Sequence, residues 1–425
     1  MNRDELRQYV ASTRIDAILK KIYCCDEAED IKKRYLDLLD EAYELYGDGD
    51  YHFVSSPGRS EIGGNHTDHQ HGHVLAAGLN IDNLAVFKAN GTKTVNYKDK
   101  ALNAISVDLE DLSVHEDEVN TSMALVRGIA ADLERLGYAT GGFDGLCDSR
   151  VLIGSGISSS ACFEVMVTEI FNHLYNEGKI TPVQRAITSQ YAENVYFGKP
   201  SGLMDQTAIS VGGFVAIDFK DPKNPVIENH DFSFSDHGYE LVLVDTKGDH
   251  ADLSNEYAAI TVEIKEVARK LGVEYLADSS LEELMKNLGQ IRKDVNNDRA
   301  ILRSIHFFLE DERAVLQKKA VSEDDVDSLL KLMRESGRSS FEYLQNVNVS
   351  SRPQSQSLAL GLAVADKVLK GEGACRVHGG GFEGTIQIVV PEGKLEELKK
   401  EINNVFGEGS LMELRVRPVG TLTVI

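Results

Sequence analysis

The chain has 425 residues, of which 42% are hydrophobic and 27% are charged, a composition typical of a folded globular protein and not of a collagen-like or largely disordered one. Its formal net charge of -23 argues against binding to nucleic acid or to an anionic membrane, unless a local basic patch overrides the overall field. The length exceeds that of one simple core, so we expect two domains of roughly 200 residues each, or one elaborate domain.

The first residues, MNRDELRQYV, are charged from the start and lack the apolar core of a secretory signal. No stretch of the sequence approaches the roughly 18 to 20 apolar residues of a membrane span. The five cysteines are an odd and sparse set without a CxxC motif, as expected for free thiols in a reducing compartment. We therefore expect a cytoplasmic protein whose partners include neither nucleic acid nor membrane.

Helices and strands are expected in a mixed order along the chain. Residues up to about 47 are expected to be helical, because apolar residues recur there at helical spacing. Further helices are expected at 123–136, after residue 158, throughout much of 257–370 and at 394–406. Strands are expected at 51–56, 84–89, 94–99, 151–153, 214–219, 240–246, 385–390 and 414–420. Because helices and strands do not alternate strictly, an α+β fold is favoured.

A polar stretch with two prolines at 220–231 is the predicted domain boundary. It divides the chain into an N-terminal domain, residues 1–220, and a C-terminal domain, residues 221–425.

Residues 151–161, VLIGSGISSSA, combine an apolar run, a loop of small residues and the start of an amphipathic helix. Glycines let a backbone approach a ligand closely, and a helix N-terminus offers unpaired N–H groups and the positive end of a dipole. The segment is therefore a candidate phosphate cradle, although it lacks the GK[ST] of a Walker A loop. A Gly/Ser turn that only caps a helix is the alternative.

Residues 57–72, PGRSEIGGNHTDHQHG, gather charged and polar side chains in a stretch interrupted by glycines, which is typical of a binding loop. His66, Asp68, His69 and His71 are possible zinc ligands, but their spacing fits no familiar zinc signature and cysteine ligands are absent. A polyol-binding loop uses the same side chains as hydrogen-bond partners. A solvated surface turn is the remaining alternative.

Two further segments contain groups of chemical interest. In AENVYFGKPSGLMDQ, residues 192–206, one of Glu193 and Asp205 could hold a metal ion while the other accepts a proton. A surface glutamate and an aspartate N-cap would give the same pattern. In GACRVHGGGFEG, residues 373–384, the many glycines indicate close backbone approach to a ligand or to another loop, or a bulged turn.

Taken together and in this order, the four segments resemble the GHMP small-molecule kinases, and within them the galactokinase family. The family pattern GRxNLIGEHTDY is matched without a gap by GRSEIGGNHTDH at 58–69, and the pattern GxGLSSSA is matched by GSGISSSA at 154–161. The AEN of 192–194, the MDQ of 204–206 and the GGGFEG of 379–384 resemble three further family motifs. The resemblance covers nearly the whole chain.

This resemblance implies a two-domain α+β fold with the active site in the cleft between the domains, and ATP-dependent phosphorylation of galactose at its C1 hydroxyl. Asp205 would accept the proton of that hydroxyl. Arg59 would lie near Asp205 and the γ-phosphate, where it would offset developing negative charge. Ser160 and Glu193 would hold Mg²⁺. The other implied contacts are to ATP, from Gly154, Ser155, Gly156, Ile157, Ser158, Ser159 and Ser160, and to the sugar, from Asn65, His66, Thr67, Asp68, Gly202 and Tyr257.

Position 65 departs from the family pattern, because Asn65 replaces the glutamate that the resemblance assigns to the C6 hydroxyl of the sugar. Neutral hydrogen bonds contribute roughly 0.5–1.5 kcal/mol and charged ones roughly 1.5–3 kcal/mol. Weaker galactose binding, or a C6-modified substrate such as galacturonate, is therefore an alternative. His69 and Glu383 are smaller departures. The competing functions are a non-catalytic sensor of galactose and ATP, and a zinc hydrolase. Monomer and dimer are both left open.

Overall fold

The computed structural model of the chain describes residues 1–151, 156–199, 201–248 and 253–425. Its α-helices are α1 (Arg3–Ala11), α2 (Asp16–Tyr23), α3 (Glu29–Tyr46), α4 (Ser122–Arg135), α5 (Ser159–Asn176), α6 (Pro182–Tyr191), α7 (Met204–Val211), α8 (Ser254–Lys270), α9 (Leu281–Val295), α10 (Asp298–Ser322), α11 (Val326–Ser339), α12 (Ser357–Leu369) and α13 (Leu395–Phe406). None of these helices is long and apolar enough to cross a bilayer.

The strands are β1 (His52–Gly63), β2 (His73–Ala89), β3 (Thr94–Asp99), β4 (Ile105–Asp108), β5 (Phe143–Ser149), β6 (Phe214–Asp218), β7 (Val226–His230), β8 (Tyr239–Asp245), β9 (Ala374–Val377), β10 (Thr385–Pro391), β11 (Leu411–Leu414) and β12 (Leu422–Thr423). Short 3-10 or π turns are η1 (Thr13–Ile15), η2 (Asp68–Gln70), η3 (Glu116–Glu118), η4 (Ala192–Phe197), η5 (Ser235–His237), η6 (Leu276–Asp278), η7 (Ser340–Leu344) and η8 (Glu392–Lys394).

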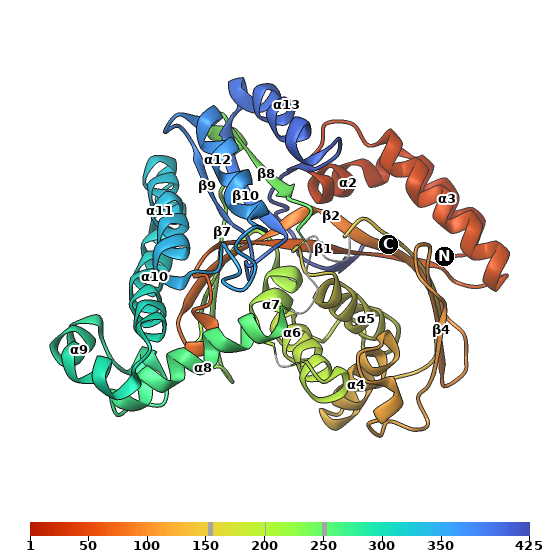
Figure 1. Cartoon of the computed structure of the whole chain (residues 1–425). Helices are drawn as coiled ribbons and strands as arrows, with labels where there is room; N and C mark the ends of the chain where they lie inside the picture. Colours follow the sequence, from red (N-terminus) through yellow and green to blue (C-terminus); the bar gives the residue numbers. More distant parts are fainter. Residues whose placement is uncertain (152–155, 200, 249–252) are drawn as a thin grey trace.

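Two long neighbouring strands, β1 and β2, form the centre of the larger sheet (Figure 1). The strands run in the order β12-β1-β2-β5-β3-β4, and β6 pairs with the first half of β2 while β7 pairs with β6. The pairs are antiparallel except for β3 with β5. Because the C-terminal β12 pairs with β1 through Val54 and Thr423, the end of the chain completes the sheet that its first strand begins.

A smaller antiparallel sheet in the order β11-β8-β10-β9 is built from the second half of the chain. Helices α12 and α13 pack on it (Figure 1). The mixed α+β architecture that the sequence predicts is confirmed. The predicted division after residue 220 stays a prediction, and it falls in the turn between β6 and β7, which pair with each other through Ile217 and Ile227.

Apolar side chains fill separate layers on the two faces of the larger sheet. The N-terminal helices bury one stripe, including Leu38 and Leu39 of α3, against β2 and β5. Helices α4 and α5 cover the other face, where Ile170 and Phe171 are fully buried. Full burial of a large apolar side chain stabilises the fold by roughly 1.5–3 kcal/mol. These layers hold β1 and the start of α5 in fixed positions.

Two expectations about local structure need correction, and a third cannot be compared with the described residues. The predicted loop at 57–72 begins later, since β1 continues to Gly63 and pairs with β2 across two register shifts. The predicted strand at 414–420 was wrong beyond Leu414, where a single bridge from Val416 to Leu79 remains and Pro418 supplies no N–H donor. The predicted strand at 151–153 lies mostly outside the described residues, and the preceding strand β5 ends at Ser149.

Candidate active site

Residues from both halves of the chain line a polar cleft of about 280 Å³. One wall comes from β1, the first turn of α5 and the start of α7, and the other comes from α8 and the turn between β9 and β10. The lining residues are Arg59, Gly156, Ser158, Ser159, Ser160, Lys199, Asp205, Tyr257, His378, Gly379, Gly380, Gly381, Glu383, Gly384 and Thr385. The cleft thus contains members of all four sequence segments that carried chemical groups.

A doubly hydrogen-bonded ion pair lies in this cleft. Arg59 Nε and Nη2 donate to Asp205 Oδ1 and Oδ2 at 2.7 and 2.8 Å, and Arg59 Nη1 donates to the carbonyl of Gly156. The Ser158 hydroxyl also donates to Asp205 Oδ2 at 2.6 Å. Burial by itself raises the pKa of Asp205, but Arg59 and Ser158 more than offset it and lower the pKa below its usual range. Asp205 is therefore an ionised carboxylate at neutral pH.

The first turn of α5 lines the cleft through Ser158, Ser159 and Ser160. Ser158 is the N-cap residue and has a left-handed φ of 63°, a conformation that costs a non-glycine residue of order 1–3 kcal/mol. Its hydroxyl binds Asp205 and does not cap the helix. A helix N-terminus presents backbone N–H groups and the positive end of the helix dipole, which favours an anion at this wall of the cleft.

Gly156 brings the loop before α5 close to the opposite wall. Its φ is +74°, and a Cβ there would lie 2.6 Å from Thr385 Oγ1, so only glycine fits without displacement. Ile157, another predicted phosphate-loop residue, is buried and accepts the Arg59 N–H through its carbonyl at 3.2 Å. Gly154 and Ser155 lie outside the described residues.

A hydroxyl and a carboxylate form the group of oxygens expected to hold a cation. Ser160 Oγ donates to Glu193 Oε1 at 3.2 Å, and Lys199 Nζ donates to the same oxygen at 3.0 Å. Gln206 Nε2 donates to Glu193 Oε2 at 2.9 Å and to Glu164 Oε2 at 3.0 Å. Partial desolvation opposes the charge on Lys199, but Glu193 raises its pKa above the usual value.

The oxygen atoms of Ser160 and Glu193 fit Mg²⁺, which prefers hydroxyl and carboxylate oxygens as ligands. Glu193 is almost fully buried, and Gln206 holds one of its oxygens in place, so the other oxygen keeps a defined direction. Glu164 lies beside it with Oε1 unpartnered among the described atoms. Burial and the Glu193 charge raise the pKa of Glu164 well above the usual value, which favours its neutral form beside Glu193.

The histidine-containing turn after β1 reaches the opposite side of the cleft. His66 Nε2 donates to the carbonyl of Gly380 at 2.9 Å, and burial lowers its pKa to about 4. A Cβ at Gly202 would lie 2.1 Å from Asp68 Oδ2, so the segment before Asp205 passes directly over Asp68. Tyr257 donates its hydroxyl to the carbonyl of Gly381 at 2.9 Å. Of these predicted sugar contacts, Tyr257 lines the cleft, while His66 adjoins it through Gly380.

Asn65 and Thr67 differ from the other predicted sugar contacts, because their side chains are fully buried in protein hydrogen bonds. Asn65 Nδ2 donates to Glu61 Oε1 at 2.9 Å and to the carbonyl of Gly379 at 2.7 Å, and its Oδ1 accepts from Asn346 at 2.9 Å. The Thr67 hydroxyl donates to the carbonyl of His73 at 2.6 Å. A sugar contact by either side chain would require these bonds to break.

Glu61 is a residue of this site to which the sequence reasoning gave no role. It is buried and pairs with the fully buried Arg376, whose Nη2 donates to Glu61 Oε1 at 2.7 Å. The signal was present in the pattern GRxNLIGEHTDY, where asparagine stands at the fourth consensus position and glutamate at the eighth. Here Glu61 and Asn65 occupy those positions in exchanged order, and they hydrogen-bond to each other.

Two further residues hold neighbouring segments together at the cleft. His378 is buried, with Nε2 3.0 Å from Ser60 Oγ and Nδ1 3.1 Å from Thr385 Oγ1. Burial and nearby arginines lower its pKa well below the usual value, so it is neutral. Glu383 is also buried and accepts hydroxyl hydrogen bonds from Ser355 and Ser357 at 3.1 and 2.7 Å. Glu383, the unusual carboxylate in the last glycine motif, thus links two loops by hydrogen bonds.

The histidine-rich turn does not gather zinc ligands. His66 donates to a backbone carbonyl, and His71 stacks on Tyr275 with ring centroids 3.6 Å apart. Across residues 1–151, 156–199, 201–248 and 253–425, no group of three or more His, Cys, Asp or Glu side chains is placed to bind one metal ion. The zinc-hydrolase alternative therefore lacks a ligand set in the part of the chain that the structure describes.

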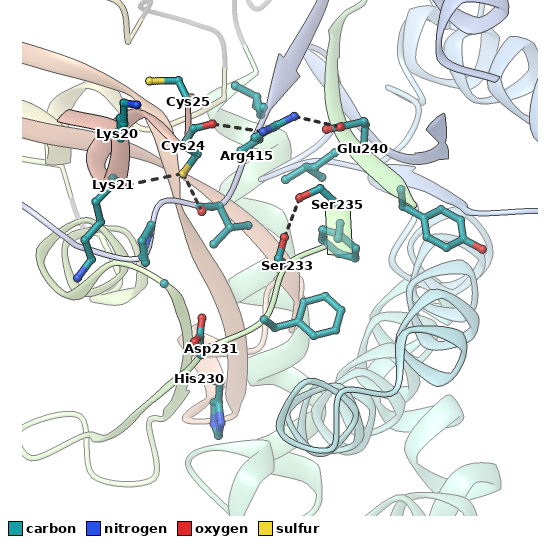
Figure 2. A pocket seen from close by; sticks show the side chains of 18 of the residues that line it. Lys20, Lys21, Cys24, Cys25, His230, Asp231, Ser233, Ser235, Glu240 and Arg415 are labelled. Carbon is teal, nitrogen blue, oxygen red and sulfur yellow. Dashed lines mark hydrogen bonds and ion pairs between the residues drawn. The ribbon is translucent and has the colours of Figure 1, made fainter. Parts of the chain in front are cut away.

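A larger hollow of about 600 Å³ lies elsewhere, beside the end of α2 and the start of β8. Figure 2 shows Arg415 between the Cys24 carbonyl and Glu240, at 3.3 and 3.4 Å from them. Ser233 and Ser235 hydrogen-bond to each other at 2.8 Å. The lining of this hollow contains charges of both signs and none of the predicted site residues. Size alone therefore does not identify the active site.

Two protein-family models match the chain. The GHMP kinases N terminal domain matches residues 124–213, which contain the serine-rich turn, Glu193 and Asp205. The galactokinase galactose-binding signature matches residues 43–89, which contain Arg59 and the histidine-containing turn. Both matched regions supply walls of the same cleft.

Curated relatives resemble the chain over most of its length. Galactokinase from Thermococcus kodakarensis is 30% identical over 356 residues, covering 83% of this chain and 93% of the relative. Galactokinase from Clostridium tetani is 27% identical over 380 residues, covering 88% and 92%.

Solved structures share the fold at lower sequence identity. Lactococcus lactis galactokinase complexed with galactose has a TM-score of 0.76 at 22% identity, covering 90% of this chain and 97% of that one. Methanococcus jannaschii mevalonate kinase has a TM-score of 0.60 at 16% identity, covering 87% and 99%.

Proposed function

The chain belongs to the galactokinase family of the GHMP kinases, and from this membership we propose that it transfers the γ-phosphoryl group of ATP to the C1 hydroxyl of galactose. The observation that carries the proposal is the Arg59–Asp205 pair beside the N-terminus of α5. An acceptor for a hydroxyl proton and donors for phosphate oxygens thus adjoin each other in one cleft.

In the proposed reaction, the C1 oxygen forms a bond to the γ-phosphorus while the bond from that phosphorus to the bridging oxygen of ADP breaks. Asp205 accepts the proton of the hydroxyl, and its lowered pKa keeps it ionised and ready to do so. A carboxylate with so low a pKa is a weak base, which suffices for a loose transition state in which the proton leaves late. Arg59 holds Asp205 in position and offsets charge that develops on the phosphoryl oxygens.

The nucleotide phosphates are proposed to lie on the first turn of α5, where Ser159 and Ser160 offer backbone N–H groups and hydroxyls. Ser160 and Glu193 would hold Mg²⁺, which would supply positive charge to the phosphates. Gln206 and Lys199 orient Glu193 beforehand. His378 and Thr385 line the other side of the cleft.

The sugar is proposed to lie along the edge formed by His66, Asp68, Gly202 and Tyr257. Galactose is the first candidate because the galactose-binding signature spans this turn. A C6-modified derivative such as galacturonate is the second, because Asn65 replaces the family glutamate and its side chain is already used by protein partners. We keep the two-domain division, the cytoplasmic location and the open choice of monomer or dimer as predictions.

A substrate panel tests the proposal. The purified chain is incubated with Mg-ATP and with galactose, galacturonate, galactosamine or glucose, and ADP release is measured in a coupled assay while phosphorus NMR identifies the phosphorylated position. We expect galactose or one galactose derivative to give a 1-phosphate, with Asp205→Asn as the inactive control. If no sugar of the panel gives ADP release although nucleotide and galactose bind, the non-catalytic sensor is favoured.

A further inference from the structure

Among the described residues that line the cleft, Lys199 is the one lysine or arginine besides Arg59. Arg59 is almost fully committed, since three of its nitrogens bind Asp205 and the Gly156 carbonyl and its side chain is 8% exposed. Lys199 is 58% exposed, and the one ion-pair partner found for it among the described residues is Glu193. The two cations therefore differ in their freedom to approach a ligand.

The backbone of Lys199 is anchored while its ammonium group is free to move. The Lys199 N–H donates to the Glu193 carbonyl at 3.1 Å, and Gly198, with a φ of +83°, ends the π turn between them. Four side-chain torsions then separate the fixed Cα from Nζ. The ammonium group can therefore swing across the cleft without any movement of the main chain.

Lys199 and Ser160 share a single oxygen atom. Lys199 Nζ and Ser160 Oγ both donate to Glu193 Oε1, at 3.0 and 3.2 Å. Glu193 is buried and needs a positive partner. Once a divalent cation pairs with Glu193, Lys199 can move away and the buried carboxylate still has a positive partner. An anion in the cleft then becomes the natural partner of the ammonium group.

We propose that Lys199 is a further catalytic residue, whose ammonium group leaves Glu193 and binds the transferred γ-phosphoryl group of ATP. The inference rests on the proposed function, because it takes ATP as the ligand. The γ-phosphoryl group is the one that must lie next to Asp205, the proton acceptor, and the charge of Lys199 acts on Asp205 across the cleft. The positive charge of Arg59 is shared with Asp205. Lys199 thus supplies additional positive charge to the phosphoryl oxygens.

Nucleotides of different length test this assignment. The affinities of Lys199→Met for AMP-PNP and for ADP, each with Mg²⁺, are measured by calorimetry, and kcat is measured with the best sugar of the panel. We expect AMP-PNP affinity to fall about 10- to 100-fold, as for loss of a charge-assisted hydrogen bond, with ADP affinity within about threefold of wild type. Lys199→Arg should recover most of the AMP-PNP affinity.

Lys367 provides a matched control, because its Nζ also lies 3.0 Å from a carboxylate, Glu401 Oε2, on the exposed surface of α12. Lys367→Met should leave nucleotide affinity and kcat unchanged. Unchanged AMP-PNP affinity and kcat in Lys199→Met, or equal losses for AMP-PNP and ADP, would overturn this inference but not the proposed function. Wild-type protein that binds neither nucleotide would overturn the proposed function and the inference with it.

Discussion

Asp205→Asn is the substitution that separates the chemical role of the Arg59–Asp205 pair from its contribution to stability. The amide keeps the shape of the carboxylate, but it offers one acceptor where Arg59 and Ser158 require two. Loss of one charge-assisted hydrogen bond costs about 1.5–3 kcal/mol of folding stability. Loss of a general base costs about 10²- to 10⁴-fold in rate, which corresponds to roughly 3–5 kcal/mol of barrier.

The control for stability is the pair formed by Arg127 and Glu118, which has the same geometry outside the cleft. Arg127 Nε and Nη2 donate to Glu118 at 2.8 and 2.7 Å, and both side chains are nearly buried. Glu118→Gln should therefore lower the free energy of unfolding by a comparable amount. It should leave turnover per folded molecule unchanged, because neither residue lines the cleft.

The measurements are urea unfolding and initial rates with Mg-ATP and saturating sugar, expressed per folded molecule. We expect both variants to lose stability and only Asp205→Asn to lose turnover. Turnover of Asp205→Asn within about tenfold of wild type would refute the role of Asp205 as proton acceptor. A matching loss of turnover in Glu118→Gln would show that the measured effect is one of stability.

Glu193→Gln should raise the Mg²⁺ concentration for half-maximal rate at least about tenfold, since one charged ligand is lost, and a magnesium titration of the rate checks this. Glu61→Asn should cost about 3–5 kcal/mol of stability because it leaves Arg376 buried without its carboxylate partner; the double variant with Asn65→Glu returns a carboxylate nearby, and urea unfolding should show partial recovery. Burial lowers the pKa of His52 to about 4, so the unfolded chain alone takes up this proton between about pH 6.5 and 4, and stability falls as pH falls through that window. His52→Phe should make the urea midpoint less dependent on pH between 7 and 5, and an unchanged slope would contradict this account.

Much of the local structure followed from the sequence, because it depends on neighbouring residues. Helical spacing of apolar residues predicted the N-terminal helices and α10, and short apolar runs predicted β6, β8 and β10. The ordered motifs also predicted which segments would meet. Where local rules failed, a longer-range interaction was responsible, as in the extension of β1 to Gly63 by pairing with β2.

What the sequence by itself determined is the set of chemical groups and their order along the chain: a guanidinium, a serine-rich turn, two carboxylates and a glycine-rich turn. Only the tertiary structure decided which atoms face each other. It gave the proximity of Arg59 and Asp205, which the resemblance implied, its two hydrogen bonds across 146 positions, and it joined Glu61 to Arg376 across 315. It also turned the Asn65 amide inward to protein partners. Contacts at such separations arise from the packing of two sheets and their helices, which local sequence patterns do not encode.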